Sequence, residues 1–254
     1  MKAAALGLLV LMAAGCSGGL PSALPTEAIL PASPEPATPS PAPATAEVGI
    51  CQHPYQPVVD GASWSYQGSG SGGDYSRTDT IDEVTDDSFL VETQLTQVQY
   101  FVTWKCTPEG LVNMRADGGM FEAVFSGPDS PVYVDVISSE GVTLPASISE
   151  GDEWDQSTSI TFSAKDIASS GTITHEAEAI GIESVTVPAG TFQAMRIDVT
   201  STMDLISFPG GEDVTFEATY WLAPGVGLVR MAGGGEAMGV EFLSEIQLVF
   251  SNQL

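Results

Sequence analysis

The sequence is poor in the residues on which most catalytic and nucleic-acid-binding sites depend. Its 254 residues include 2 histidines, 3 cysteines, and 7 lysines and arginines. The part from Cys51 onward has no Gly-x-Ser-x-Gly elbow of the kind found in lipases and esterases, and no Cys-x-x-Cys pair occurs anywhere. His53 and His175 do not have the spacing of a metal motif. We therefore expect a protein that is not an enzyme, with no catalytic residues, no cofactor and no metal site.

Positive charge is scarce, whereas acidic residues are abundant. The chain carries 33 Asp and Glu, and its formal net charge is −26. Nucleic-acid binding needs Lys and Arg to neutralise phosphates, so this composition excludes a nucleic-acid partner and disfavours anionic lipid head groups. The charge is explained most simply by solubility outside the cell. Calcium binding is the alternative, because one turn carries four carboxylates with no known calcium-motif spacing: Asp82, Glu83, Asp86 and Asp87.

Pairs of carboxylates raise the question of glycoside hydrolysis, which needs two of them facing each other across a cleft. Glu176 and Glu178 share one strand face with Thr172 and Thr174 and are typical of a solvated surface. The segment Asp152–Asp155 places three acids around a tryptophan, as a sugar-binding edge could. Such clusters arise by chance in a chain this acidic, so we expect no hydrolytic site.

Apolar runs long enough to span a membrane are also absent. The run at the N-terminus follows Met1-Lys2 and extends from Ala3 to Ala14. It is shorter than the roughly 20 residues needed to cross a hydrocarbon core of about 30 Å. One positive charge, a short apolar run and small residues at its end are typical of a secretory signal peptide.

The end of this run, Met12–Cys16, resembles the lipobox of bacterial lipoproteins. In that family the cysteine thiol takes a diacylglycerol, the chain is cut before it, and the new amine is usually acylated. Ala13 departs from the leucine that the family prefers there. The resemblance implies a signal peptide over residues 1–15 and a lipid on Cys16, which would anchor the protein on the extracytoplasmic side of the cell membrane or outer membrane. An ordinary secretory signal with an incidental cysteine is the alternative.

The next segment, residues 16–50, is rich in Pro, Ala, Ser and Thr and has hardly any large apolar side chain after Leu30. Such a sequence cannot bury enough surface to fold, and it favours polyproline II, which extends about 3.1 Å per residue. We expect a disordered tether that connects the lipid to one domain over residues 51–254.

Two cysteines remain in the predicted domain, Cys51 and Cys106. An even pair in an oxidising compartment favours a disulfide. The bridge would close a loop of about 55 residues and stabilise the domain by about 4 kcal/mol. Two buried free thiols are the alternative.

Hydrophobic alternation with a period of two dominates the rest of the chain. It is clear over Val98–Cys106, Met195–Val199 and Val214–Leu222, and a last segment places Met238, Val240, Phe242, Ile246, Leu248 and Phe250 on one face. This pattern is typical of antiparallel strands with one buried and one solvated face. Gly233–Gly235 is predicted to interrupt the strands. The sequence therefore predicts an all-β domain with a strongly curved antiparallel sheet, a half-barrel or open barrel; a two-sheet β-sandwich is the alternative.

Two phrases go beyond periodicity. Val185–Ala194 contains Pro-Ala-Gly-Thr-Phe, and Tyr220–Val229 reads Tyr-Trp-Leu-Ala-Pro-Gly-Val-Gly-Leu-Val. Together they resemble uncharacterised bacterial envelope and lipoprotein domains with a "TPAGTF" turn and a "YWxAPGVGxV" hairpin. The resemblance implies a half-barrel similar to that of the LolA-like lipoprotein carriers, and no established activity. In physical terms both phrases contain turns.

Tyr220 and Trp221 are the candidate ligand-binding residues, one on each face of their strand. We expect a monomeric, membrane-anchored lipoprotein domain that binds a lipid or other hydrophobic ligand on its concave face. The alternative is a structural or interaction module that is displayed on the cell envelope and binds protein or glycan through its outer face. A tightly packed interior would favour this alternative.

Overall fold

The structure is a computed structural model that describes residues 49–96, 98–115, 132–164, 167–205, 214–237 and 240–254. All of these belong to one compact unit, Ala46–Leu254. The predicted signal peptide, the lipid acceptor Cys16 and nearly all of the predicted tether lie outside the described residues. Where the chain is described it contains no helix, and hence none with the length and hydropathy to cross a membrane.

The described residues contain thirteen strands, which form a single antiparallel sheet. They are β1 (Ser63–Gly70), β2 (Gly73–Asp82), β3 (Ser88–Leu95), β4 (Gln99–Thr107), β5 (Gly110–Asn113), β6 (Val132–Gly141), β7 (Leu144–Pro145), β8 (Glu153–Ala164), β9 (Ile167–Val187), β10 (Gly190–Leu205), β11 (Val214–Ala223), β12 (Gly227–Ala237) and β13 (Val240–Ser251). Their order is β6-β8-β9-β10-β11-β12-β13-β1-β2-β3-β4-β5-β7. The predicted all-β antiparallel fold is confirmed, and the two-sheet alternative is wrong because β1 pairs with β13 and joins both runs of strands.

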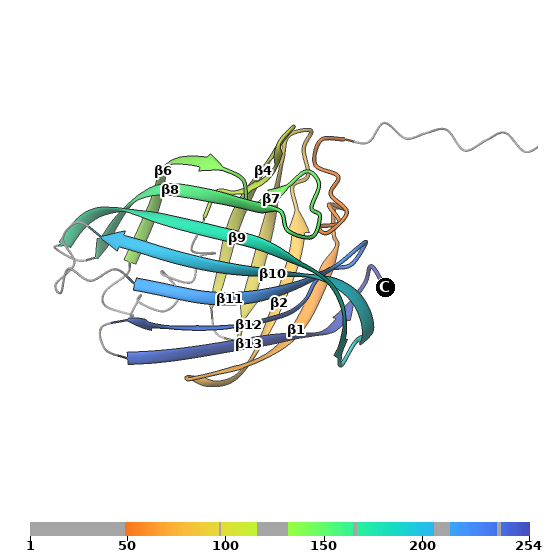
Figure 1. The fold of residues 1–254 in the computed structure, drawn as a ribbon. Helices are drawn as coiled ribbons and strands as arrows, with labels where there is room; N and C mark the ends of the chain where they lie inside the picture. The colour runs from red at the N-terminus through yellow and green to blue at the C-terminus, as the bar shows by residue number, and fades with distance from the viewer. Residues whose placement is uncertain (1–48, 97, 116–131, 165–166, 206–213, 238–239) are drawn as a thin grey trace, which may run out of the picture. The chain divides into compact units, whose positions relative to one another are not determined.

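The sheet curves strongly where β13 meets β1. Figure 1 shows β1 to β5 crossing β8 to β12 at a steep angle. Two side chains of β1 reach past β13 to backbone carbonyls at the β11–β12 turn and in β12: Trp64 Nε1 donates to Val226 O at 2.6 Å, and Tyr66 Oη donates to Leu228 O at 3.2 Å. A bulge between Ser65 and Tyr66 accompanies this bend, as expected where a sheet turns sharply.

The concave side of the bend holds the core. Its largest fully buried apolar side chains come from both runs of strands: Ile81, Phe89, Leu111, Val229, Ile246 and Leu248. These residues lie on the apolar sides of alternating strands, and the face opposite is mostly polar. One continuous sheet therefore buries its own inner face by folding over it.

The two edge strands, β6 and β7, do not pair with each other, and the sheet is open. Only Val142 and Thr143 separate them in the chain, so the edges lie close together at this point. The fully buried Gln156 of β8 connects β6, the two-residue linker and β5, because it donates to Ser139 Oγ at 2.9 Å and to Asn113 O at 2.8 Å, and accepts from Thr143 Oγ1 at 2.5 Å. Backbone bonds from Val142 N to Asp155 O and from Thr143 N to Leu111 O hold the same linker between β8 and β5.

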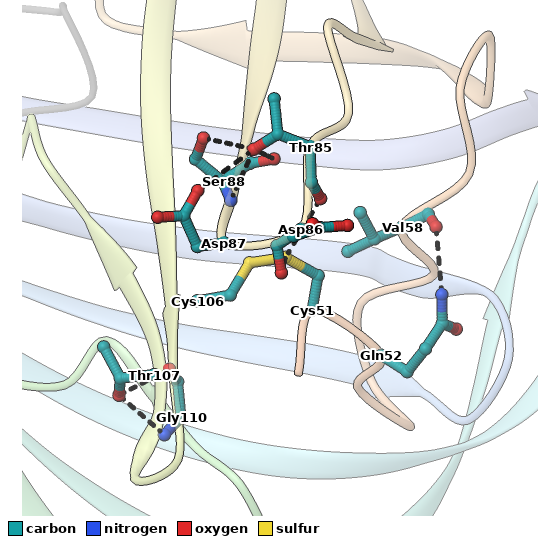
Figure 2. Close-up of a disulfide and its surroundings, with 10 residues drawn as sticks. All are labelled: Cys51, Gln52, Val58, Thr85, Asp86, Asp87, Ser88, Cys106, Thr107 and Gly110. Carbon is teal, nitrogen blue, oxygen red and sulfur yellow. Dashed lines mark hydrogen bonds between the residues drawn. A yellow bond between two sulfur atoms is a disulfide. The ribbon is translucent and has the colours of Figure 1, made fainter. Parts of the chain in front are cut away.

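A disulfide joins Cys51 to Cys106 of β4, as predicted, with the Cα atoms 4.9 Å apart. Figure 2 shows the bridge beside Asp86 and Asp87, in the turn that connects β2 to β3. Both cysteines belong to the core. The bridge therefore fixes the start of the domain to its most tightly packed part.

Two details of the sequence prediction are wrong. Gly233–Gly235 does not interrupt the strands but lies inside β12, where neighbouring strands leave no room for side chains. A Cβ on Gly235 would lie 2.3 Å from Thr215 O, and one on Gly233 would lie 2.6 Å from Glu217 O. Phe250 does not share a face with Ile246 and Leu248, because the bulge opposite Ser65 and Tyr66 adds a residue to β13 and leaves Phe250 59% exposed.

Candidate ligand-binding site

The two predicted ligand-binding residues lie on opposite faces of β11, as expected. Tyr220 pairs with Ile197 and Met231, both buried on the concave face, and it packs against the core. Trp221 pairs with Arg196 and Arg230 on the outer face. The structure therefore separates them into two environments, which are described in turn.

A charged pair lies on the concave face, on β2. Arg77 pairs across the sheet with the buried Tyr66, and its guanidinium carbon lies 5.8 Å from the centre of that ring. Arg77 binds Asp79 with both nitrogen branches, Nε to Oδ1 at 2.9 Å and Nη2 to Oδ2 at 2.8 Å. Thr93 Oγ1 also donates to Asp79, at 2.8 Å. The carboxylate is thus fully engaged, whereas the guanidinium keeps further N–H groups available.

Charge and burial both affect the pKa values of Arg77 and Tyr220. Burial alone would lower the pKa of Arg77, but the charge of Asp79 and the neighbouring Tyr100 and Tyr66 raise it, so the guanidinium is always charged. Burial raises the pKa of Tyr220, and the charge of Arg77 acts in the opposite direction. Three strands separate β11 from β2 in the sheet order, a distance of roughly 19 Å along a flat sheet. The charge of Arg77 therefore acts on Tyr220 across the concave side, and not along the sheet.

Aromatic side chains continue along the concave face beyond this pair. Five of them are half-buried: Tyr75, Tyr100, Phe216, Tyr220 and Phe242. The rings of Phe216 and Phe242 stack with their centroids 5.7 Å apart. They lie on either side of Gly235, which lacks the side chain that would separate them. Tyr75 covers Gly68 in the same way and bonds Ser244 Oγ at 2.9 Å.

Solvent reaches this part of the concave face. The side chain of Arg77 is 26% exposed, although it points to the same side as Trp64 and Tyr66, which are 3% and 4% exposed. Further along the same face of β9 and β10, His175 Nδ1 and Ser201 Oγ share a hydrogen bond of 2.6 Å, and both residues are half-buried. The accessible part of the concave face therefore combines aromatic rings, the guanidinium of Arg77 and hydroxyl groups.

The outer environment of Trp221 is charged. The guanidinium of Arg230 lies 4.8 Å from the centre of its ring, and its indole N–H donates to Glu183. Arg196 and Asp198 form an ion pair beside it, at 2.8 Å. Trp221 is therefore held in place by charged neighbours on the solvated face, and Tyr220 is the residue that faces the charged pair of β2.

The other sequence candidates remain separate from this site. The buried His53 bonds Pro145 O at 2.7 Å, and burial lowers its pKa. In the acidic turn, Asp82 accepts from Glu83 N and Asp87 accepts from Thr85. Across the part of the chain that the structure describes, no three His, Cys, Asp or Glu side chains are grouped so that they could hold a metal ion.

Sequence reasoning missed Arg77. Its signal was a cation in the series Tyr75, Arg77, Asp79 and Ile81, which alternate on one face of β2. Without the register to Trp64 and Tyr66, that face could not be assigned to the inside of the sheet.

A sequence family and a solved structure resemble this chain. A sequence family described as DUF3108-like matches residues 130–232, from the region of β6 into β12. A protein of Bacteroides fragilis, described as exported and as having a YmcC-like fold, superposes with a TM-score of 0.55 at 14% identity, over 79% of this chain and 100% of its own. This likeness shows that the two share a fold.

Two further solved structures are more distant. A protein of Parabacteroides distasonis that is described as a lipoprotein has a TM-score of 0.48 at 18% identity, over 78% of this chain and 98% of its own. The hypothetical lipoprotein YmcC of Escherichia coli has a TM-score of 0.36 at 11% identity, over 80% of this chain and 89% of its own. No curated protein sequence matches the chain.

Proposed function

We propose that this chain is a non-enzymatic, membrane-anchored protein of the cell envelope that holds an amphiphilic ligand against the concave face of its sheet. The observation that carries the proposal is the accessible part of that face. Large aromatic side chains are usually buried in a core, and a contiguous group of them that solvent reaches often marks a binding site. Here such a group lies on the inner surface of the sheet beside the partly exposed Arg77.

The chemistry of the face indicates the class of ligand. The stacked rings of Phe216 and Phe242 offer apolar contact area. Arg77 is already neutralised by Asp79, and its remaining N–H groups can donate to an ester, amide or hydroxyl oxygen without a second carboxylate or phosphate. A molecule with an acyl chain and an oxygen-rich polar end fits both properties.

The cellular location in the proposal has separate support. The N-terminus resembles a lipoprotein signal that ends at Cys16, and the Cys51–Cys106 disulfide suits an oxidising compartment. The Bacteroides fragilis protein with the same fold is described as exported. Lipidation of Cys16 would place the concave face near a source of acyl chains.

Native mass spectrometry tests the proposal. The chain from Ser17 to Leu254 would be exported to an oxidising periplasm and purified without detergent. We expect a bound mass in the lipid range that organic extraction removes. A clean unliganded mass that does not change after incubation with cell lipid extract would contradict the proposal and favour an interaction module.

Two matched variants place the ligand. Phe216→Glu puts a charge on the concave face, and we expect it to abolish the bound mass. Phe101→Glu makes the same change on the outer face, where Phe101 is 47% exposed, and should leave the bound mass unchanged. Equal loss in both variants would contradict binding on the concave face.

A further inference from the structure

The outer face of the sheet carries a second surface that the proposed ligand does not use. A hollow of about 310 Å³ lies over β13, β1 and β2, and besides Gly68 and Tyr75 its lining has five polar residues: Gln67, Ser69, Asp74, Glu245 and Gln247. These five residues alternate with the buried residues of their strands and therefore point outward. The volume is at the lower end of the range for small-molecule sites, about 300–1,000 Å³.

The hollow ends a row of side chains that crosses five strands. Cross-strand pairing aligns Arg196 of β10, Trp221 of β11, Arg230 of β12, Gln247 of β13 and Gln67 of β1. All of them have planar polar groups or an aromatic ring. Such groups can donate hydrogen bonds or give ring contact to an extended ligand that lies along the row.

One side of the hollow is held in a fixed position. Glu245 Oε1 accepts from Arg230 Nε at 3.0 Å and Nη2 at 2.8 Å, and from Gln247 Nε2 at 2.9 Å. All three bonds use the same oxygen, so within the described residues Oε2 has no partner. The guanidinium also lies over the ring of Trp221. The carboxylate is therefore oriented in advance, with one acceptor oxygen available.

The polar side chains on the opposite side of the hollow are free to bind a ligand. Among the described residues, the side chains of Gln67, Ser69 and Asp74 make no hydrogen bond. Amides and hydroxyls both donate and accept, and carboxylates accept. Sugar hydroxyls have the same dual character, so this lining can form paired bonds to neighbouring hydroxyl groups.

Charge and polarity disfavour anionic and apolar occupants. The lining has two carboxylates and the chain has a formal net charge of −26, so an anionic ligand would be repelled. An apolar ligand would strip water from amide and carboxylate groups and give no bonds in return. We propose that the hollow and the row of side chains beside it bind an uncharged saccharide, and that this outer face attaches the domain to a neutral glycan.

Affinity electrophoresis of the chain from Ser17 to Leu254 tests the proposal. Native gels would contain dextran, galactomannan or mixed-linkage glucan, with polygalacturonate as the anionic match. We expect at least one neutral polysaccharide to slow the protein and polygalacturonate to have no effect. Retardation by none of the neutral polymers, or by polygalacturonate alone, would overturn the proposal.

Paired variants locate the binding. The change Gln67→Ala with Asp74→Ala removes one amide and one acid from the hollow, and we expect about a tenfold or greater loss of apparent affinity. The control Gln193→Ala with Glu217→Ala removes the same groups from exposed positions elsewhere and should keep full affinity. Equal affinities for both variants would overturn the assignment. So would calcium binding by calorimetry that only the first variant loses, with no polysaccharide binding.

Discussion

The two ends of the concave face differ in how completely their side chains are buried. At the packed end, Phe89 and Ile81 are each 1% exposed, and the disulfide joins the same core. At the open end, Phe216, Phe242 and Tyr75 are only half-buried, although they face the same side of the sheet. Arg77 lies between the two ends. The sheet thus uses one inner face for two purposes, and we expect stability to depend on the packed end and ligand binding on the open end.

Removal of the disulfide is expected to have the largest effect. Replacing both Cys51 and Cys106 with alanine frees a loop of 55 residues and should lower the free energy of unfolding by about 4 kcal/mol. Urea unfolding measures the change. The bound mass should persist under conditions where the variant is folded. A loss of less than about 1 kcal/mol would show that the bridge does not anchor the packed end.

Paired phenylalanine variants compare the two ends directly. Phe89→Ala empties a fully buried position that stacks on Trp104, with ring centroids 5.8 Å apart, and should cost about 3 kcal/mol. Phe216→Ala at the half-buried open end should cost about 1 kcal/mol. Urea unfolding of both variants measures the two losses of unfolding free energy. Equal losses would show that the ends do not differ in packing.

Arg77→Met tests the boundary between the ends. It leaves Asp79, whose side chain is 11% exposed, with Thr93 as its remaining side-chain partner, and should cost about 2 kcal/mol. The double variant with Asp79→Asn removes both charges and should cost less than the sum of the two single changes. Additive costs would show that the pair does not interact strongly.

A pH effect at the packed end is expected to be smallest. Burial lowers the pKa of His53 below its ordinary 6.5, so in the acid range the unfolded chain binds a proton more readily than the folded one. The free energy of unfolding should be highest above pH 6.5 and should fall below it by up to about 1.4 kcal/mol per pH unit. His53→Gln can keep the bonds to Pro145 O and Tyr55 N without titrating. The same pH dependence in this variant would exclude His53 as the cause.

Local alternation was enough to predict three of the strands. Residues around Val102, Ile197 and Tyr220 alternate because each strand has one face in the core, and the structure has them in that arrangement. Gly233–Gly235 was misassigned because glycine in a sequence often indicates a turn. Here the glycines allow β11 and β13 to lie close to β12. The bulge that turns Phe250 outward depends on pairing with a strand about 180 residues away in the chain, which no local pattern reveals.

The candidate site was predictable only in part. Tyr220 was identified from a motif, and its orientation from alternation. Its relation to Arg77 depends on how far the sheet bends, and that bend is set by pairing between the first and last strands. The outer hollow has no sequence signal, because Gln67 and Glu245 are ordinary solvated residues until the register places them side by side.

The pairing of β1 with β13 also affects how the chain folds, because the chain is synthesised from the N-terminus. Ser63–Gly70 is synthesised early, and its partner Ser244–Ser251 is synthesised last. One edge of β1 therefore stays unpaired until nearly the whole domain has been made. An unpaired edge beside exposed apolar residues is prone to associate with other chains, and such long-range pairing is slow. The large negative charge would keep waiting chains apart by repulsion. The acidic composition then protects the unfinished chain as well as the finished one.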